Sequence, residues 1–228
     1  MKNKFIVIEG TDGSGKETQL NLLEVKLKKR GFGIKTTDFP RYEETVWGNL
    51  VGRMLMGEFG DPANISPYLA TLPYAVDQYF GSLKIQEWLK AGKTVLANRY
   101  FTSNIHQVGK LDGKERVKFR KWLWNIGWNE LKLVKPDLVI VLFVPVNTSM
   151  ELVNKKLKRN YTKKEGTDLV EKDKNYQEKA AEEYKRMCKT EKNWVLLKCT
   201  DKKGNLKSKQ KIHEEVVRII NKKLKIAF

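Results

Sequence analysis

The sequence has few of the residues that mark a disulfide framework, a metal centre or a membrane span. It contains two cysteines among 228 residues, Cys188 and Cys199, and they lack metal-ligand spacing, so we expect reduced structural thiols. No apolar run approaches the roughly 18 residues of a transmembrane helix, and the N-terminus enters a strand without the apolar region of a signal peptide. We therefore expect a cytoplasmic protein with no membrane partner.

Acidic residues are also scarce relative to basic ones, which gives a formal net charge of +18. Lysine is dense at 155–164 and 202–225, but acidic residues interleave both regions and no aromatic ladder accompanies them. This pattern is typical of solvated helix faces, so nucleic acid is not the expected partner. The remaining positive charge could serve a nucleotide-binding cleft.

The segment 5–19 predicts a phosphate-binding loop. An apolar strand at 5–8 runs into Gly10, Gly13 and Gly15, and these glycines permit a backbone path that lets N–H groups converge on an anion at a helix start. Lys16 completes most of the motif GxxxxGK[ST], whose last position holds Glu17 in place of a hydroxyl. Thr18, one residue later, can supply the hydroxyl.

Strands and helices alternate along the chain. We expect strands at 5–9, 34–38, 94–97, 138–143 and 194–198, and helices at 16–30, 46–56, 67–91, 101–109, 114–131, from 147, at 170–189 and from 208. This order predicts an α/β fold of a single domain, residues 1–228, with a five-stranded parallel sheet flanked by helices. Ligands of such sheets bind at the carboxyl ends of the strands, here the loop after Glu9, residues 38–42 and residues 98–100.

Three motifs in this order, GTDGSGKETQ, DFPRY and ANRYFTSNIHQ, resemble the thymidylate kinase family of P-loop nucleoside monophosphate kinases. The resemblance covers nearly the whole chain. It implies transfer of the γ-phosphoryl group of ATP to dTMP with Mg²⁺, a basic lid at about 155–168, and a homodimer, although the sequence itself does not set the oligomeric state. Phosphoryl transfer requires cations from several loops around the site, which agrees with this chain.

The resemblance implies roles for individual residues, which fall into four groups. ATP would be bound by Gly10, Gly13, Ser14, Gly15, Lys16, Glu17 and Thr18. The acceptor would be bound by Asp12, Phe39, Arg41, Tyr74, Gln78, Arg99, Ser103, Asn104 and Gln107. The catalytic set would be Lys16, Arg99, Asp12 and the lid cation Arg159. Mg²⁺ would be held through phosphates, with Glu9, Asp12 or Thr18 as protein ligands.

Several of these residues have a simpler structural interpretation. Arg41 could be a surface turn residue, Asp12 could cap its own turn, and Tyr74 could belong to the core. His106 adjoins the base-reading stretch and could line the cleft, but a solitary histidine is more often structural.

The chain departs from the family pattern at four positions. Gln78 stands where the family has Arg, Asn98 where it usually has Asp, and Phe143 where Asp is common. Glu17 places a carboxylate beside polyphosphate. Two alternatives therefore stay open: a related monophosphate kinase with another acceptor, and a catalytically weak P-loop protein that binds nucleotide or nucleic acid.

Overall fold

A five-stranded parallel sheet forms the centre of the protein. The computed structural model describes residues 3–159 and 173–226, with the backbone alone for 153–159. The strands lie in the order β2-β3-β1-β4-β5 and every neighbouring pair is parallel. Their bounds are β1 Phe5–Glu9, β2 Ile34–Asp38, β3 Thr94–Asn98, β4 Leu138–Phe143 and β5 Trp194–Lys198. The predicted sheet is confirmed.

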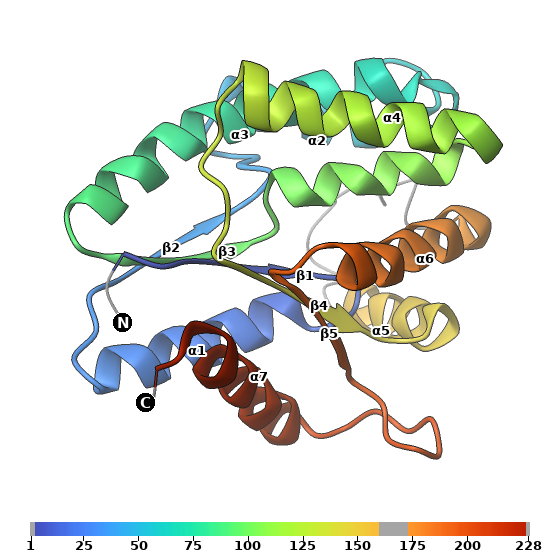
Figure 1. Ribbon diagram of the computed structural model, residues 1–228. Coiled ribbons are helices and arrows are strands. Elements are labelled where there is room, and N and C mark those ends of the chain that lie inside the picture. The colour runs from blue at the N-terminus through green and yellow to red at the C-terminus, as the bar shows by residue number, and fades with distance from the viewer. Residues whose placement is uncertain (1–2, 160–172, 227–228) are drawn as a thin grey trace.

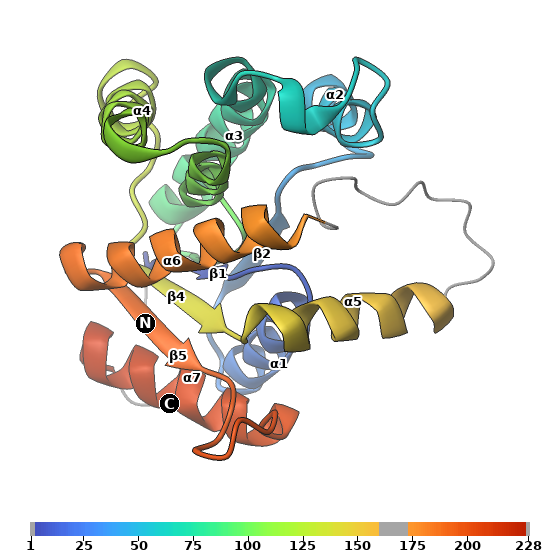
Figure 2. The ribbon, with the colours of Figure 1, turned by 90° about the vertical axis from the view of Figure 1, so that its right-hand side faces the viewer.

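Helices cover both faces of this sheet (Figures 1 and 2). One face carries α1 (Lys16–Lys29) and α7 (Lys209–Leu224). The other carries α2 (Val46–Leu55), α3 (Pro67–Lys90), α4 (Gly113–Asn125) and α6 (Lys174–Thr190). Helix α5 (Val146–Arg159) follows β4.

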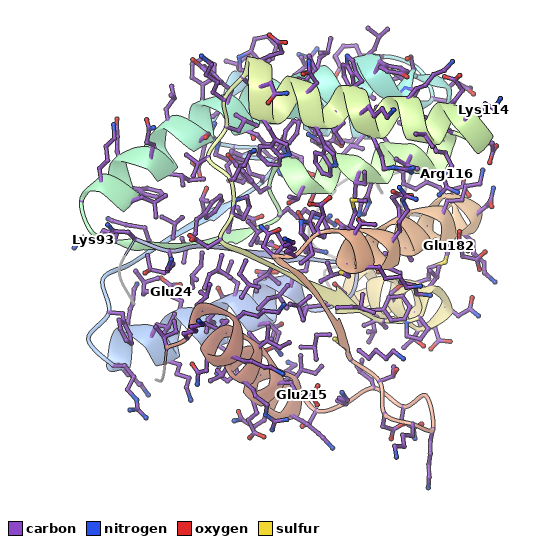
Figure 3. All side chains as sticks on the ribbon, viewed as in Figure 1. Glu24, Lys93, Lys114, Arg116, Glu182 and Glu215 are labelled. Carbon is purple, nitrogen blue, oxygen red and sulfur yellow. The ribbon has the colours of Figure 1, made fainter. Side chains whose placement is uncertain are left out.

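The central strand β1 is buried on both faces, because each face packs on a helical layer. Phe5 and Val7 belong to the core under α3, α4 and α6, whereas Ile6 and Ile8 belong to the core against α1 and α7. All four side chains are fully buried, and side chains fill the space on both sides of the sheet (Figure 3). Alternating side-chain directions along a strand explain why an unbroken apolar run suits this position.

The helix expected at 114–131 differs in detail from the prediction. Helix α4 ends at Asn125, and the chain continues as a π-helical turn, η3 (Ile126–Glu130). Gly127 lies in this turn against the ring of Phe101, and a Cβ there would come within 2.1 Å of that ring. The wider turn therefore lies where the buried Phe101 ring packs against the backbone. Hydrophobic periodicity in the sequence does not reveal this contact.

Strand order brings the three candidate loops together at one edge of the sheet. Because β1 and β2 both pair with β3, Ile8 and Asp38 both lie opposite Asn98 in the register. Arg99 follows directly, with a positive φ of 63°, and leads into the 3₁₀ helix η2 (Phe101–Lys110). The short 3₁₀ helix η1 (Pro62–Asn64) lies before α3 in the chain.

Within residues 3–159 and 173–226, no helix has the length and apolar character needed to cross a bilayer. The predicted basic lid at about 155–168 lies outside the described side chains, and only the α5 backbone up to Arg159 falls within the description.

Candidate active site

The glycine-rich loop after β1 has the backbone that an anion cradle requires. Gly10 has a φ of 144°, and a Cβ at that position would lie 2.5 Å from the carbonyl oxygen of Leu142. Gly13 and Gly15 also have positive φ values, of 76° and 85°. A side chain is therefore excluded sterically at Gly10 and disfavoured conformationally at all three positions.

The loop keeps hydrogen-bonding groups available for a ligand. The N-cap residue of helix α1 is Gly15, which has no side chain to accept a hydrogen bond from the first turn of the helix. The buried hydroxyl oxygens of Thr11 and Ser14 have no hydrogen-bond partner in the part of the chain that the structure describes. Buried polar groups are normally satisfied, so these two hydroxyls fit a loop that binds a polar ligand.

Lys16 lies across this loop. Its Nζ donates to the carbonyl oxygens of Gly10 at 3.1 Å and Thr11 at 2.9 Å. In the first turn of α1, Glu17 points to solvent while Thr18 is half-buried. Thr18 is therefore the less exposed of the two oxygen-bearing side chains next to Lys16.

Asp12 joins the phosphate loop to the end of β3. Its carboxylate accepts a hydrogen bond from Arg99 and lies 3.6 Å from Lys16 Nζ. Burial raises the pKa of Asp12, but the charges of Arg99 and Lys16 outweigh that effect and hold the pKa well below its usual range. Burial by itself would lower the pKa of Arg99, but the Asp12 carboxylate raises that pKa by more, so the guanidinium stays charged. Asp12 is thus more than a local turn cap.

Glu9, a predicted metal ligand, is fully buried below this cluster. Its carboxylate accepts hydrogen bonds from the hydroxyls of Thr102 (2.6 Å), Ser103 (2.9 and 2.7 Å) and Tyr184 (2.7 Å). These hydrogen bonds satisfy the buried carboxylate of Glu9 with protein groups alone, and they fix the start of η2 relative to β1.

His106 belongs to the same network. Its Nε2 lies 2.9 Å from the hydroxyl oxygen of Tyr184. Because that hydroxyl donates its proton to Glu9, Nε2 must carry the proton and Nδ1 must be an acceptor. Burial, with the charge of Arg99 second, lowers the pKa of His106 to about 3, so the ring is neutral.

A cavity beside this cluster collects most of the predicted acceptor residues. It is lined by eight of the nine, namely Asp12, Phe39, Tyr74, Gln78, Arg99, Ser103, Asn104 and Gln107. Residues without a predicted acceptor role also line the cavity, including His106, Lys110, Tyr176 and Gln177. Of these, only His106 is a candidate for the cleft from its place in the sequence, since it adjoins the base-reading stretch. The others come from α6 and the end of η2.

Arg41 is the predicted acceptor residue that does not line the cavity. Its Nε donates to Asp77 Oδ1 at 3.0 Å and its second terminal nitrogen donates to the Asp77 carbonyl oxygen at 2.6 Å. Asp77 is fully buried and also accepts from the Thr45 hydroxyl at 2.7 Å. Arg41 therefore holds the DFPRY segment on α3 through a buried ion pair, whose partner lies 36 residues further along the chain.

Two of the unusual positions have identifiable neighbours. Asn98 donates from Nδ2 to Asp38 Oδ2 at 2.9 Å, so the carboxylate missing at the end of β3 is found one strand away, at the end of β2. Phe143 lies beneath Lys185, whose ammonium group is 4.5 Å from the ring centroid. The family-type carboxylates are thus replaced by an amide with an adjacent carboxylate and by an aromatic ring with an adjacent cation.

Comparison with known proteins agrees with the motifs. The sequence model of the thymidylate kinase family matches residues 8–212. A probable thymidylate kinase from Thermococcus onnurineus is 37% identical over 155 residues, covering 66% of this chain and 71% of the relative. The thymidylate kinase of Mycobacterium tuberculosis is 32% identical over 148 residues, covering 64% of this chain and 69% of the relative.

Similarity extends over nearly the full length in other cases. The thymidylate kinase of Fervidobacterium nodosum is 29% identical over 222 residues, covering 95% of this chain and 98% of the relative. Among solved structures, a thymidylate kinase from Candida albicans shares the fold with a TM-score of 0.72 at 22% identity, covering 97% of this chain and 93% of that one. With its fold, its three motifs and a family match from residue 8 to 212, the chain belongs to the thymidylate kinase family.

Proposed function

We propose that the glycine-rich loop binds ATP, that the adjoining cavity binds dTMP, and that the two substrates meet at Asp12. Family membership gives the reaction, transfer of the γ-phosphoryl group of ATP to dTMP. One observation supports the assignment of sides most strongly: Lys16 from the donor loop and Arg99 from the cavity wall converge on the same carboxylate. Lys16, Arg99 and Asp12 thus lie together where the two proposed binding sites meet.

Positioning and charge neutralisation account for the chemistry that these residues perform. The acceptor phosphate is already anionic, so its oxygen attacks the γ-phosphorus of ATP without a protein base. The bond between that phosphorus and the β,γ-bridging oxygen breaks, and the electron pair leaves with ADP. Lys16 and the loop N–H groups stabilise charge on the donor, while Arg99 holds the acceptor phosphate. Asp12 orients both cations.

The donor set at this site suits Mg²⁺ that arrives with ATP. Thr18 and Asp12 offer oxygen ligands, and no group of three or more acidic, histidine or cysteine side chains that could hold a metal occurs within residues 3–159 and 173–226. Mg²⁺ commonly binds through one or two protein oxygens plus phosphates and water. When bound, the ion would neutralise charge on the donor phosphates. We do not propose Glu9 as a metal ligand, because its carboxylate already accepts hydrogen bonds from buried hydroxyl groups.

Three further expectations stay predictions. Arg159, the last residue of α5, is proposed as a lid cation, although its side chain lies outside the described part of the chain. A homodimer is expected from the family resemblance, and a cytoplasmic location is expected from the composition of the sequence.

A steady-state assay of purified protein with ATP, Mg²⁺ and each monophosphate in turn tests the proposal. We expect ADP release to depend on dTMP and to exceed the rates with AMP and GMP. An Arg99→Lys variant should raise the KM for dTMP more than the KM for ATP, because a lysine cannot reproduce the two-pronged contact of a guanidinium. Turnover on none of the monophosphates would overturn the proposal. An Arg99→Lys effect confined to ATP would overturn the assignment of sides.

A further inference from the structure

Two buried amide side chains lie end to end in the wall of the proposed dTMP cavity. Gln78 on α3 and Asn104 on η2 are 2% and 3% exposed, and both line the cavity. Asn104 Nδ2 donates to Gln78 Oε1 at 2.8 Å, and Gln78 Nε2 donates to the backbone carbonyl oxygen of Tyr100 at 3.2 Å. The three groups form one hydrogen-bonded row.

The Tyr100 carbonyl sets the direction of this row. A carbonyl oxygen only accepts hydrogen bonds, so the nitrogen of Gln78, and not its oxygen, must face it. Gln78 Oε1 then faces Asn104, so Asn104 must donate a hydrogen bond to it from Nδ2. The amide oxygen of Asn104 makes no hydrogen bond within the described residues. This oxygen and the second N–H of the same amide can therefore bind a ligand in the cavity.

The arrangement opposes rotation of the Asn104 amide. Turning that amide by half a turn would place its oxygen against the oxygen of Gln78. Relieving the clash by turning Gln78 as well would place an oxygen against the Tyr100 carbonyl. Either change leaves a buried acceptor facing another acceptor, which is costly where water is excluded.

We propose that Gln78 is a positioning residue that selects the acceptor base by fixing the Asn104 amide oxygen toward it. The inference rests on the proposed function, because it assumes that the cavity holds the nucleotide base. Thymine and uracil carry a ring N–H between two carbonyl groups, which matches an amide oxygen beside an N–H donor. Cytosine held at the same place would present the lone pair of its ring nitrogen to the Asn104 oxygen and be rejected. Gln78, which replaces the family's arginine, thereby restores preference among pyrimidines.

The test compares dTMP with dCMP in the wild-type protein and in a Gln78→Met variant, by kcat/KM and by calorimetric Kd. Met keeps much of the volume and removes both hydrogen bonds, so Asn104 can rotate. We expect the wild type to prefer dTMP by at least about a hundredfold, as sites built around a specific donor do. We expect the ratio to fall at least about tenfold in the variant, with the dTMP KM raised and the dCMP KM lowered. The same substitution on the exposed side of α3, Gln86→Met, serves as the control and should leave the ratio unchanged.

Each outcome decides between the proposal and its alternatives. A purely structural role for Gln78 would raise both KM values together and leave their ratio intact, which would overturn the proposal. Equal binding of dTMP and dCMP by the wild-type protein would overturn it without any variant, so the test survives a variant that fails to fold. Failure of the proposed function is distinguishable, because the wild-type protein would then phosphorylate neither nucleotide.

Discussion

Asp12 connects the proposed ATP-binding loop to the proposed dTMP cavity. The Asp12 side chain is partly exposed, yet its carboxylate accepts a hydrogen bond from Arg99 and lies near the ammonium group of Lys16. Two cations from different loops therefore share one carboxylate. An acidic residue inside a phosphate-binding loop is unfavourable unless it organises such cations. The Asp12 carboxylate is therefore expected to matter for turnover more than for folding.

Replacing Asp12 with Asn should lower kcat/KM for dTMP at least about tenfold, because Arg99 and Lys16 lose the carboxylate that orients them. Steady-state kinetics measures this. Asp112→Asn is the matched control, since Asp112 is exposed and its ion pair with Lys179 is screened by solvent. Equal kinetic effects of the two variants would contradict a special role for Asp12.

Glu9 illustrates a second use of a carboxylate in the same region, as an internal acceptor for three hydroxyl groups. A Glu9→Gln variant would present an amide nitrogen to hydroxyls that already donate. We expect a loss of about 1–3 kcal/mol in the free energy of unfolding, measured by urea denaturation. A variant as stable as the wild type would show that the network does not need the negative charge.

At the scale of elements, α3 and η2 build the cavity because they pack closely on the strand ends. Gly81 on α3 is the contact point with Phe39, since a Cβ there would lie 2.3 Å from the Phe39 ring. The Phe39 ring is itself part of the cavity wall. A small residue at this helix position therefore shapes the acceptor site from outside it.

Gly81→Ala is expected to destabilise the protein and raise the KM for dTMP several-fold, although alanine at an ordinary helix position is favourable by about 1 kcal/mol. The rigid Phe39 ring must move to admit the methyl group. Thermal denaturation and acceptor kinetics would measure the two effects. Increased stability with unchanged KM would mean that Phe39 moves away without cost.

The elements themselves were largely predictable, whereas the choice of partners was not. Unbroken apolar runs such as 138–143 identify buried strands, and glycine and lysine at fixed spacing identify the phosphate loop. The sequence gives no local signal that Arg41 pairs with Asp77, or that Glu9 meets Tyr184 from α6, because packing of distant segments decides these contacts. The cations of the candidate site were predicted from the strand ends, but their orientations needed the fold.

At the scale of the whole molecule, the described fold keeps a neutral histidine and an ionised carboxylate close together. The lowered pKa of His106 means that the unfolded chain takes up a proton below about pH 6.5 that the folded chain does not take up until about pH 3. Asp12 acts in the same direction below its ordinary pKa. Stability is therefore expected to be full above about pH 6.5 and to fall as the pH falls.

The expected loss from His106 is at most about 1.4 kcal/mol per pH unit, since one proton is involved. Urea denaturation at a series of pH values would measure it, with His106→Gln as the comparison, because a glutamine nitrogen can still donate to Tyr184. The variant should show a shallower slope between about pH 6.5 and 4. Equal slopes would mean that His106 does not titrate as described.

The loop and the cavity are proposed to form one phosphotransfer site. Its most direct test uses ATP radiolabelled at the γ-phosphate, incubated with Mg²⁺, dTMP and the wild-type protein, followed by separation of the products. We expect label in dTDP, with little free phosphate, and loss of that transfer in a Lys16→Ala variant. Label that appears only as inorganic phosphate, or that stays in ATP, would contradict it.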